Sequence, residues 1–132
     1  MFSTAPREPD NNELFTLFVG LPASVRTYVC TGYTDLRKSI DGLSAIVEEK
    51  FGMNPFAKSF FLFCGSSADR LKILFYDGDS FNVTVRRLEK IRLKWPRVAD
   101  QMWLISRFEF INLLSGEKLR ENLVIRIITA IP

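Results

Sequence analysis

The feature that most constrains the fold of this chain is an unbroken apolar run at residues 60–64. A strand with one face in solvent alternates apolar and polar side chains, whereas a continuous apolar run predicts a strand that is covered on both faces. The fold must therefore place other elements over each side of a central strand.

The residues after this run predict a β-hairpin. Residues 71–76 and 81–86 both alternate with a period of two, and Asp77 and Gly78 between them form a reversal signal. We expect the alternation to gather polar side chains into one basic platform for nucleic acid, partly covered where it meets the apolar central strand. The side chains expected on that face are Arg70, Lys72, Tyr76, Asn82, Thr84 and Arg86.

Three shorter segments favour further strands. Residues 25–31 alternate and are rich in β-branched and aromatic side chains, which predicts the first strand of the chain. The apolar residues 102–105 indicate a short strand, and the apolar, β-branched residues 123–131 indicate an edge strand.

A first helix is predicted between Thr34 and Gly52. Thr34 suits the N-cap position, Asp35 suits the positive first turn, and Gly52 can supply the left-handed stop. We interpret Gly42, inside this helix, as a point of close approach to the sheet. The apolar positions recur at helical spacing and are Leu36, Ile40, Leu43, Val47 and Phe51.

A second helix is predicted from the capping-box spacing of Ser106 and Glu109, with Gly116 as its C-terminal stop. Together these elements indicate an α+β fold: an antiparallel β-sheet of about four to five strands that contains a hairpin or meander, with two main α-helices packed against it. We expect residues 1–24 to form a flexible leader with a short apolar arm, and residues 25–132 to form a single domain.

Composition excludes several classes of function. The chain has no histidine, which removes the commonest metal ligand, the usual general base near neutral pH and every catalytic triad built on histidine. Cys30 and Cys64 lie in apolar, strand-like runs and are expected to be buried and reduced. No apolar run approaches the roughly 18 residues of a membrane span, and the first residues lack the basic start of a secretory signal, so a cytoplasmic protein is expected.

The best functional signal is a concentration of positive charge after the hairpin. The net charge of the chain is only +3, yet residues 86–97 contain six Lys or Arg and a single Glu. Such a segment can contact successive phosphates, and Trp95 can stack on an exposed base. The expected nucleic-acid-binding residues are Arg86, Arg87, Lys90, Arg92, Lys94, Trp95 and Arg97, with Arg70 and Lys72 of the hairpin. The competing interpretation is a solvated charged face with Trp95 folded back onto the core.

Several acidic residues are candidate ligands for a catalytic metal. Asp77 and Asp79 flank Gly78, but Asp77 and Gly78 together are typical turn chemistry. Asp35 suits a helix start, and Asp41 has the i, i+4 spacing for an ion pair with Arg37. These structural explanations are stronger, so no catalytic residue, metal site or cofactor is expected.

Two blocks of the chain resemble a known family. Residues 31–43, and the stretch from Phe61 to Pro96, resemble in order and spacing the TnpB (second open reading frame) accessory proteins of the insertion-sequence-sixty-six transposon family. The residues that carry the family motif are Thr34, Asp35, Arg37, Lys38, Asp41, Gly42, Asp69, Arg70, Lys72, Asp77 and Gly78.

This resemblance implies a bacterial protein that assists transposition beside a separate, larger transposase, and it supplies no catalytic residue. We therefore expect a non-catalytic accessory protein whose partner is DNA at the transposon ends, the element's transposase, or both, and which binds through the basic segment. The alternative is an adaptor that docks on the transposase through the apolar residues 123–131 and makes no direct contact with DNA.

Overall fold

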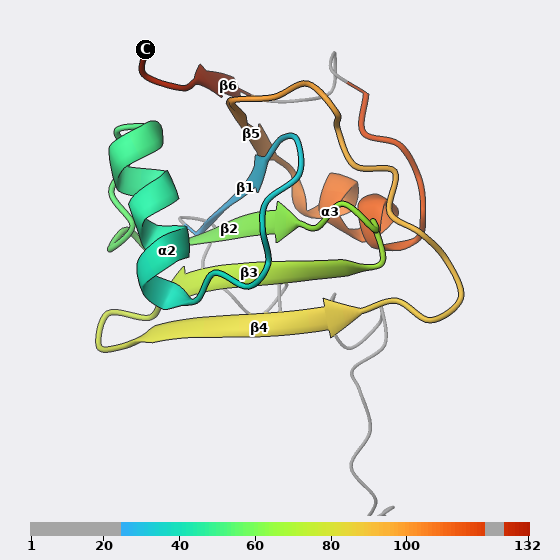
Figure 1. Ribbon diagram of the computed structural model, residues 1–132, viewed down its shortest axis with the longest axis horizontal. Coiled ribbons are helices and arrows are strands. Elements are labelled where there is room, and N and C mark those ends of the chain that lie inside the picture. Colours follow the sequence, from blue (N-terminus) through green and yellow to red (C-terminus); the bar gives the residue numbers. More distant parts are fainter. Residues whose placement is uncertain (1–24, 121–125) are drawn as a thin grey trace, which may run out of the picture.

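The computed structural model describes residues 25–120 and 126–132, and within them six strands form one sheet (Figure 1). The strands lie across the sheet in the order β4-β3-β2-β1-β5-β6. Their bounds are β1 Arg26–Cys30, β2 Ser59–Cys64, β3 Arg70–Tyr76, β4 Phe81–Arg87, β5 Gln101–Ile105 and β6 Arg126–Thr129. The predicted leader and residues 123–125 of the predicted edge strand lie outside the described residues.

The predicted α+β class is confirmed, with two differences in the sheet. The described residues hold six strands rather than four or five. Strands β1 and β2 pair in parallel, whereas every other neighbouring pair is antiparallel. The parallel pair arises because a helix connects β1 to β2, and such a crossover lets the second strand run in the same direction as the first.

The central strand β2 is covered on both faces, as its apolar sequence predicts, and all of its residues are buried. The helices are α2 Ile40–Ala45, the π-helix η1 Ile46–Lys50 that continues it, and α3 Arg107–Leu114. On one face Leu43 of α2 belongs to the same core cluster as Phe61, and on the other face Phe110 of α3 belongs to the same cluster as Leu62. The two helices thus cover opposite faces of the sheet (Figure 1).

The first helix begins later than predicted, with Ser39 rather than Thr34 in the N-cap position. The residues before it form a separate turn, in which Asp35 Oδ1 accepts a hydrogen bond from the backbone N–H of Arg37 at 3.0 Å. An aspartate that accepts from the backbone two residues ahead offers the chain an alternative to the helix. The predicted pairing of Arg37 with Asp41 is also wrong, because the guanidinium of Arg37 pairs with Asp35 at 2.8 Å.

The two glycines of the first helix have different roles. Gly52 has a φ of +64° and ends the helix, as predicted. Gly42 was predicted to permit close approach to the sheet. Instead, the three atoms nearest to a Cβ added there belong to the side chain of Lys38, beginning at 3.0 Å. The absent Cβ therefore makes room for the lysine side chain one turn earlier.

The second helix follows its prediction closely. The hydroxyl of Ser106 accepts from Glu109 N–H at 3.1 Å, and the carboxylate of Glu109 accepts from Ser106 N–H at 2.9 Å, which completes the capping box. Gly116, with a φ of +88°, follows the end of the helix. The start and the stop of α3 were thus both readable from local sequence.

The hairpin is confirmed, but its predicted polar face is wrong. Tyr76 pairs with Phe81 across a turn of four residues, so each residue of β3 lies opposite one of the other parity in β4. Lys72 therefore shares a face with Val85, and Arg86 shares the opposite face with Leu71. The six polar side chains expected together are divided between the two faces, and no continuous polar platform forms.

Both cysteines are buried and free, as predicted. Burial raises the pKa of the Cys30 thiol to about 11 and that of the Cys64 thiol to about 12. Neither side chain is therefore a thiolate at neutral pH. None of the helices in the described part of the chain has the length and apolar character that crossing a bilayer requires.

Candidate nucleic-acid interface

The chain after β4 is tied by backbone hydrogen bonds to two loops at one end of the sheet. Leu93 N–H donates to Ala68 O, in the loop between β2 and β3, at 2.6 Å. Gly32 N–H, just after β1, donates to Pro96 O at 2.8 Å. These bonds hold the segment in place although most of it belongs to no helix or strand.

Side chains along this segment alternate between the core and solvent. Leu93 and Trp95 belong to the core cluster on the α3 face, whereas Arg92, Lys94 and Arg97 are exposed. An extended chain points successive side chains to opposite sides. The two buried residues therefore anchor the segment and direct its cations outward.

Trp95 is not placed to stack on a base. Only 4% of it is exposed, and its indole N–H donates to Cys30 O at 2.9 Å, at the end of β1. A buried indole usually satisfies its single donor in this way, and stacking on a nucleotide would require that bond and the packing to be broken. The prediction that Trp95 contacts nucleic acid is therefore wrong, and the residue is a structural anchor.

The cations of the segment differ in their partners. Arg87 forms an ion pair with Glu89 at 2.7 Å, and Arg92 donates to Ser67 O at 2.8 Å. Lys90, Lys94 and Arg97 are exposed and form no ion pair with another described residue. Their charges are thus available to an external anion. The half-buried Arg86 lies on the α3 face, through its pairing with Leu71.

The two hairpin cations expected beside the segment adjoin its start, with Arg70 opposite Arg87 and Lys72 opposite Val85, and each has a polar partner of its own. Lys72 Nζ donates to Lys38 O at 2.9 Å, in the turn before α2. Arg70 lies 3.9 Å from the carboxylate of Asp69. Lys72 lies on the α2 face of the sheet, because residues two apart in a strand share a face and Leu74 belongs to the core cluster on that face.

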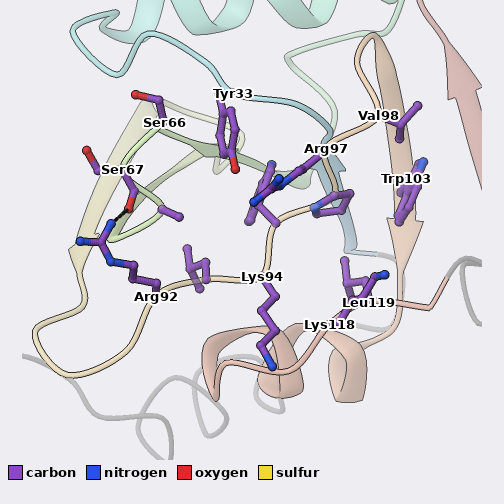
Figure 2. Close-up of a pocket in the computed structure, with 14 residues that line it drawn as sticks. Tyr33, Ser66, Ser67, Arg92, Lys94, Arg97, Val98, Trp103, Lys118 and Leu119 are labelled. Carbon is purple, nitrogen blue, oxygen red and sulfur yellow. Dashed lines mark hydrogen bonds between the residues drawn. The ribbon is translucent and has the colours of Figure 1, made fainter.

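The exposed cations surround a hollow of about 620 Å³ (Figure 2). Arg92, Lys94 and Arg97 reach it from the segment, and Lys118 reaches it from the chain after α3. Among the described residues that line it, four are Lys or Arg and none is Asp or Glu. The apolar part of the lining is Ala68, Leu93, Trp95, Pro96, Val98, Trp103 and Leu119. We call this site the basic hollow.

Three other polar residues complete the basic hollow and were not expected there. Tyr33 enters from the loop after β1, and Ser66 and Ser67 enter from the turn after β2. Tyr33 lies in the block 31–43 that resembles the family, but nothing in the local sequence says which way its ring points. The burial of Trp95 could be predicted from the alternation of charged and apolar side chains over residues 92–95. Lys118 follows α3, and no sequence signal connects it with this segment.

Part of the family motif lines a second, smaller depression of about 390 Å³ next to the basic hollow. Its lining includes Thr34, Asp35 and Arg37 from the turn before α2, and Asp69 and Arg70 from the start of β3. The two depressions share Ser66 and Ser67. The hydrogen bonds from Arg37 lower the pKa of Asp35 to about 2, so this carboxylate is charged at neutral pH. The second depression thus brings together two blocks that are distant in sequence, the turn before α2 and the start of β3.

The other motif residues lie elsewhere. Asp41 and Gly42 are in α2, and Asp77 and Gly78 form the hairpin turn. Asp77 accepts from the backbone N–H groups of Asp79 and Ser80, both at 2.8 Å, and these bonds lower the pKa of its carboxyl. Within the described ranges, no group of three or more acidic or cysteine side chains is close enough to hold a metal ion.

Comparison with known proteins gives one family and two curated relatives. The family model described as IS66 Orf2 like protein matches residues 25–123. The chain is 33% identical over 93 residues to an uncharacterized protein of Sinorhizobium fredii (strain NBRC 101917 / NGR234), y4hO, with 70% of this chain and 81% of the relative covered. It is 29% identical over 98 residues to a second uncharacterized protein of that strain, y4jC, with 74% and 84% covered. No solved structure matches the chain significantly.

Proposed function

This chain belongs to the IS66 Orf2-like family of transposon accessory proteins, and from that premise we propose that it is a non-catalytic factor that binds DNA directly. In this proposal the contact surface is the rim of the basic hollow, above all Lys94 and Arg97, with Arg92 and Lys118 beside them. The DNA of the transposon is the polyanion that an accessory protein of transposition meets.

The observation that carries the proposal is the uncompensated charge of the rim. Four cations and no acid line the hollow among the described residues, and Lys94 and Arg97 form no ion pair there. A cation that is already paired within the protein must break that pair to bind a phosphate, whereas a free one only displaces water and counterions. The rim is thus suited to release the counterions of a bound strand.

The positions of the cations also favour one contact surface. They come from the segment after β4 and from the chain after α3, and the fold brings both to the same hollow. The backbone bonds of Leu93 and Gly32 fix the segment before any DNA arrives. A preformed surface loses less conformational entropy on binding than a loose one.

The experiment that tests this proposal is DNA binding as a function of salt, measured by fluorescence anisotropy. The double variant Lys94→Glu with Arg97→Glu should bind DNA at least about ten-fold more weakly at low salt, because it replaces two phosphate contacts by two repulsions. The corresponding alanine variant should reduce the slope of log K against log salt by about 2.

A matched control reverses two exposed charges outside the basic hollow, Lys58→Glu with Arg126→Glu. This control changes the net charge by the same amount, so a loss of affinity in both double variants would indicate attraction by net charge alone. Equal affinity of the wild type and the Lys94 and Arg97 variant would remove the rim from the account.

A second candidate function is an adaptor for the transposase, favoured by the edge strand β6. This strand pairs with β5, and its side chains Ile127 and, just beyond it, Ile131 are exposed. An exposed sheet edge with apolar side chains can accept a strand from another protein. Co-purification of the transposase with wild type but not with Ile127→Lys would favour the adaptor, and equal recovery would count against it.

A further inference from the structure

The basic hollow has a chemistry that phosphate binding alone does not require. Its rim is cationic, but its interior is lined by apolar side chains that include parts of Leu93, Trp103 and Leu119. A volume of about 620 Å³ falls in the range of sites that take a small organic ligand, about 300 to 1,000 Å³. This volume and lining suit a ligand that is weakly polar on one side and anionic on the other.

Tyr33 provides an aromatic surface in this hollow. It is 46% exposed, whereas Trp95 and Trp103, which also line the hollow, are buried. Figure 2 shows its ring extending from the chain after β1 toward the other side chains that line the hollow. An exposed aromatic ring beside cations is the arrangement with which proteins bind bases of single-stranded nucleic acid.

The backbone on both sides of Tyr33 is fixed. Gly32 N–H donates to Pro96 O at 2.8 Å, and Thr34 N–H donates to Cys64 O at 2.8 Å. These bonds connect the tyrosine loop to the cationic segment and to the end of β2. The backbone that carries the ring therefore has a set position relative to the cationic segment, which lowers the entropy lost when a base stacks on Tyr33.

We propose that the basic hollow binds an unpaired nucleotide of a DNA strand, with its base against Tyr33 and its flanking phosphates on Lys94, Arg97 and Lys118. The inference rests on the proposed function and specifies the DNA ligand as single-stranded DNA or a frayed DNA end. Ser66 and Ser67 are exposed and also line the hollow, and a serine hydroxyl can donate to a base edge or to a phosphate. Base pairing in a duplex would keep the base out of the hollow.

The test compares a short oligodeoxythymidylate with a duplex of the same strand length in the anisotropy assay. A surface that recognises phosphates alone binds the duplex more tightly, because the duplex has the higher charge density. The wild type should instead bind the single strand more tightly. Tyr33→Ala should weaken single-strand binding about ten-fold and leave duplex binding nearly unchanged, since a lost base stack affects only the unpaired base.

Two further variants control for other causes. Tyr33→Phe retains the ring and should bind the single strand nearly as tightly as the wild type. Phe108→Ala removes an exposed aromatic residue of α3 that does not line the basic hollow and should have no effect. Rescue by phenylalanine separates stacking from a general disturbance of the loop.

The failure of this inference is distinguishable from failure of the proposed function. Tighter duplex binding, or an unchanged affinity of Tyr33→Ala for the single strand, would overturn the unpaired nucleotide even where binding still depends on Lys94 and Arg97. Binding of neither DNA form, or binding that ignores Lys94 and Arg97, would overturn the proposed function and this inference together.

Discussion

The two ends of the sheet use their polar residues in opposite ways. At the hairpin end, Asp77 accepts hydrogen bonds from the backbone of Asp79 and Ser80 and from the side chain of Asn82 at 3.3 Å. At the other end, Lys94 and Arg97 stand exposed without an ion pair among the described residues. Charge at the hairpin end therefore builds the turn, whereas the charges of Lys94 and Arg97 at the hollow end form no ion pair within the described part of the protein.

The aromatic residues show the same contrast. At the hairpin end Phe56, Tyr76 and Phe81 pack on one another, with ring centroids 4.9 to 5.1 Å apart. Tyr33, at the hollow end, makes no ring contact with another described aromatic residue. A side chain already engaged in the fold is a poor binding contact, so the hollow end suits the binding that we propose better than the hairpin end does.

The largest expected effect on stability is that of Trp95, the one predicted contact that the structure assigns to the core. Trp95→Ala should lower the free energy of unfolding by about 3 to 5 kcal/mol, as large truncations in a core do. Trp95→Phe should lower it by about 1 to 3 kcal/mol, because Cys30 O loses its donor. Urea unfolding measures both changes.

The phenylalanine variant also sharpens the comparison between core and surface. Without urea, where it is folded, the Trp95→Phe variant should bind DNA as the wild type does, because the indole of Trp95 is buried and the cations are exposed. Loss of DNA binding by a folded Trp95→Phe protein would mean that Trp95 belongs to the contact surface, and the distinction between core and surface residues would fail.

A smaller effect is expected at the hairpin turn. Asp77→Ala should destabilise the protein less than Trp95→Ala, because Asp77 is exposed, and it should leave DNA affinity unchanged. The folded-state pKa of Asp77 is lowered by its hydrogen bonds, so the stabilisation is complete above the unfolded pKa of about 4 and is lost as the pH falls through the lower folded value.

Unfolding experiments between pH 7 and pH 2 measure this dependence. The stability difference between wild type and Asp77→Ala should be constant near neutral pH and shrink below about pH 4. A difference that grows as the pH falls would mean that the neutral carboxyl, not the carboxylate, supports the turn.

The smallest effect on stability is expected at the rim of the basic hollow. Lys94→Glu with Arg97→Glu should change the free energy of unfolding by no more than about 0.5 kcal/mol per site, as exposed residues without partners usually do. A large loss of stability in the same urea experiment would mean that these cations support the fold, and the contrast between the two ends would fail.

Sequence was a good guide where a single local signal decides the structure. The capping box of Ser106 and Glu109 and the apolar run of β2 each fixed an element without reference to the rest of the chain. The first helix was harder, because Asp35 satisfies nearby backbone groups in a turn of its own and delays the helix to Ser39.

The candidate site was predictable only in part. The charge after the hairpin is visible in the sequence, and its outward direction follows from the alternation with Leu93 and Trp95. The division of the hairpin cations depends on the length of the turn between Tyr76 and Phe81, which fixes the register. Tyr33 and Lys118 line the same hollow only because the whole fold brings their segments together, so no local sequence pattern could predict this arrangement.

The most direct test of the contrast between the two ends is an amide chemical-shift map of the 15N-labelled protein during titration with DNA. The account predicts that the shifts gather at the basic hollow, at Tyr33, Ser66 and Ser67, at Arg92 to Val98 and at Lys118, while Asp77 to Asn82 stay unchanged. Shifts centred on the hairpin turn, or spread evenly over the surface, would contradict it.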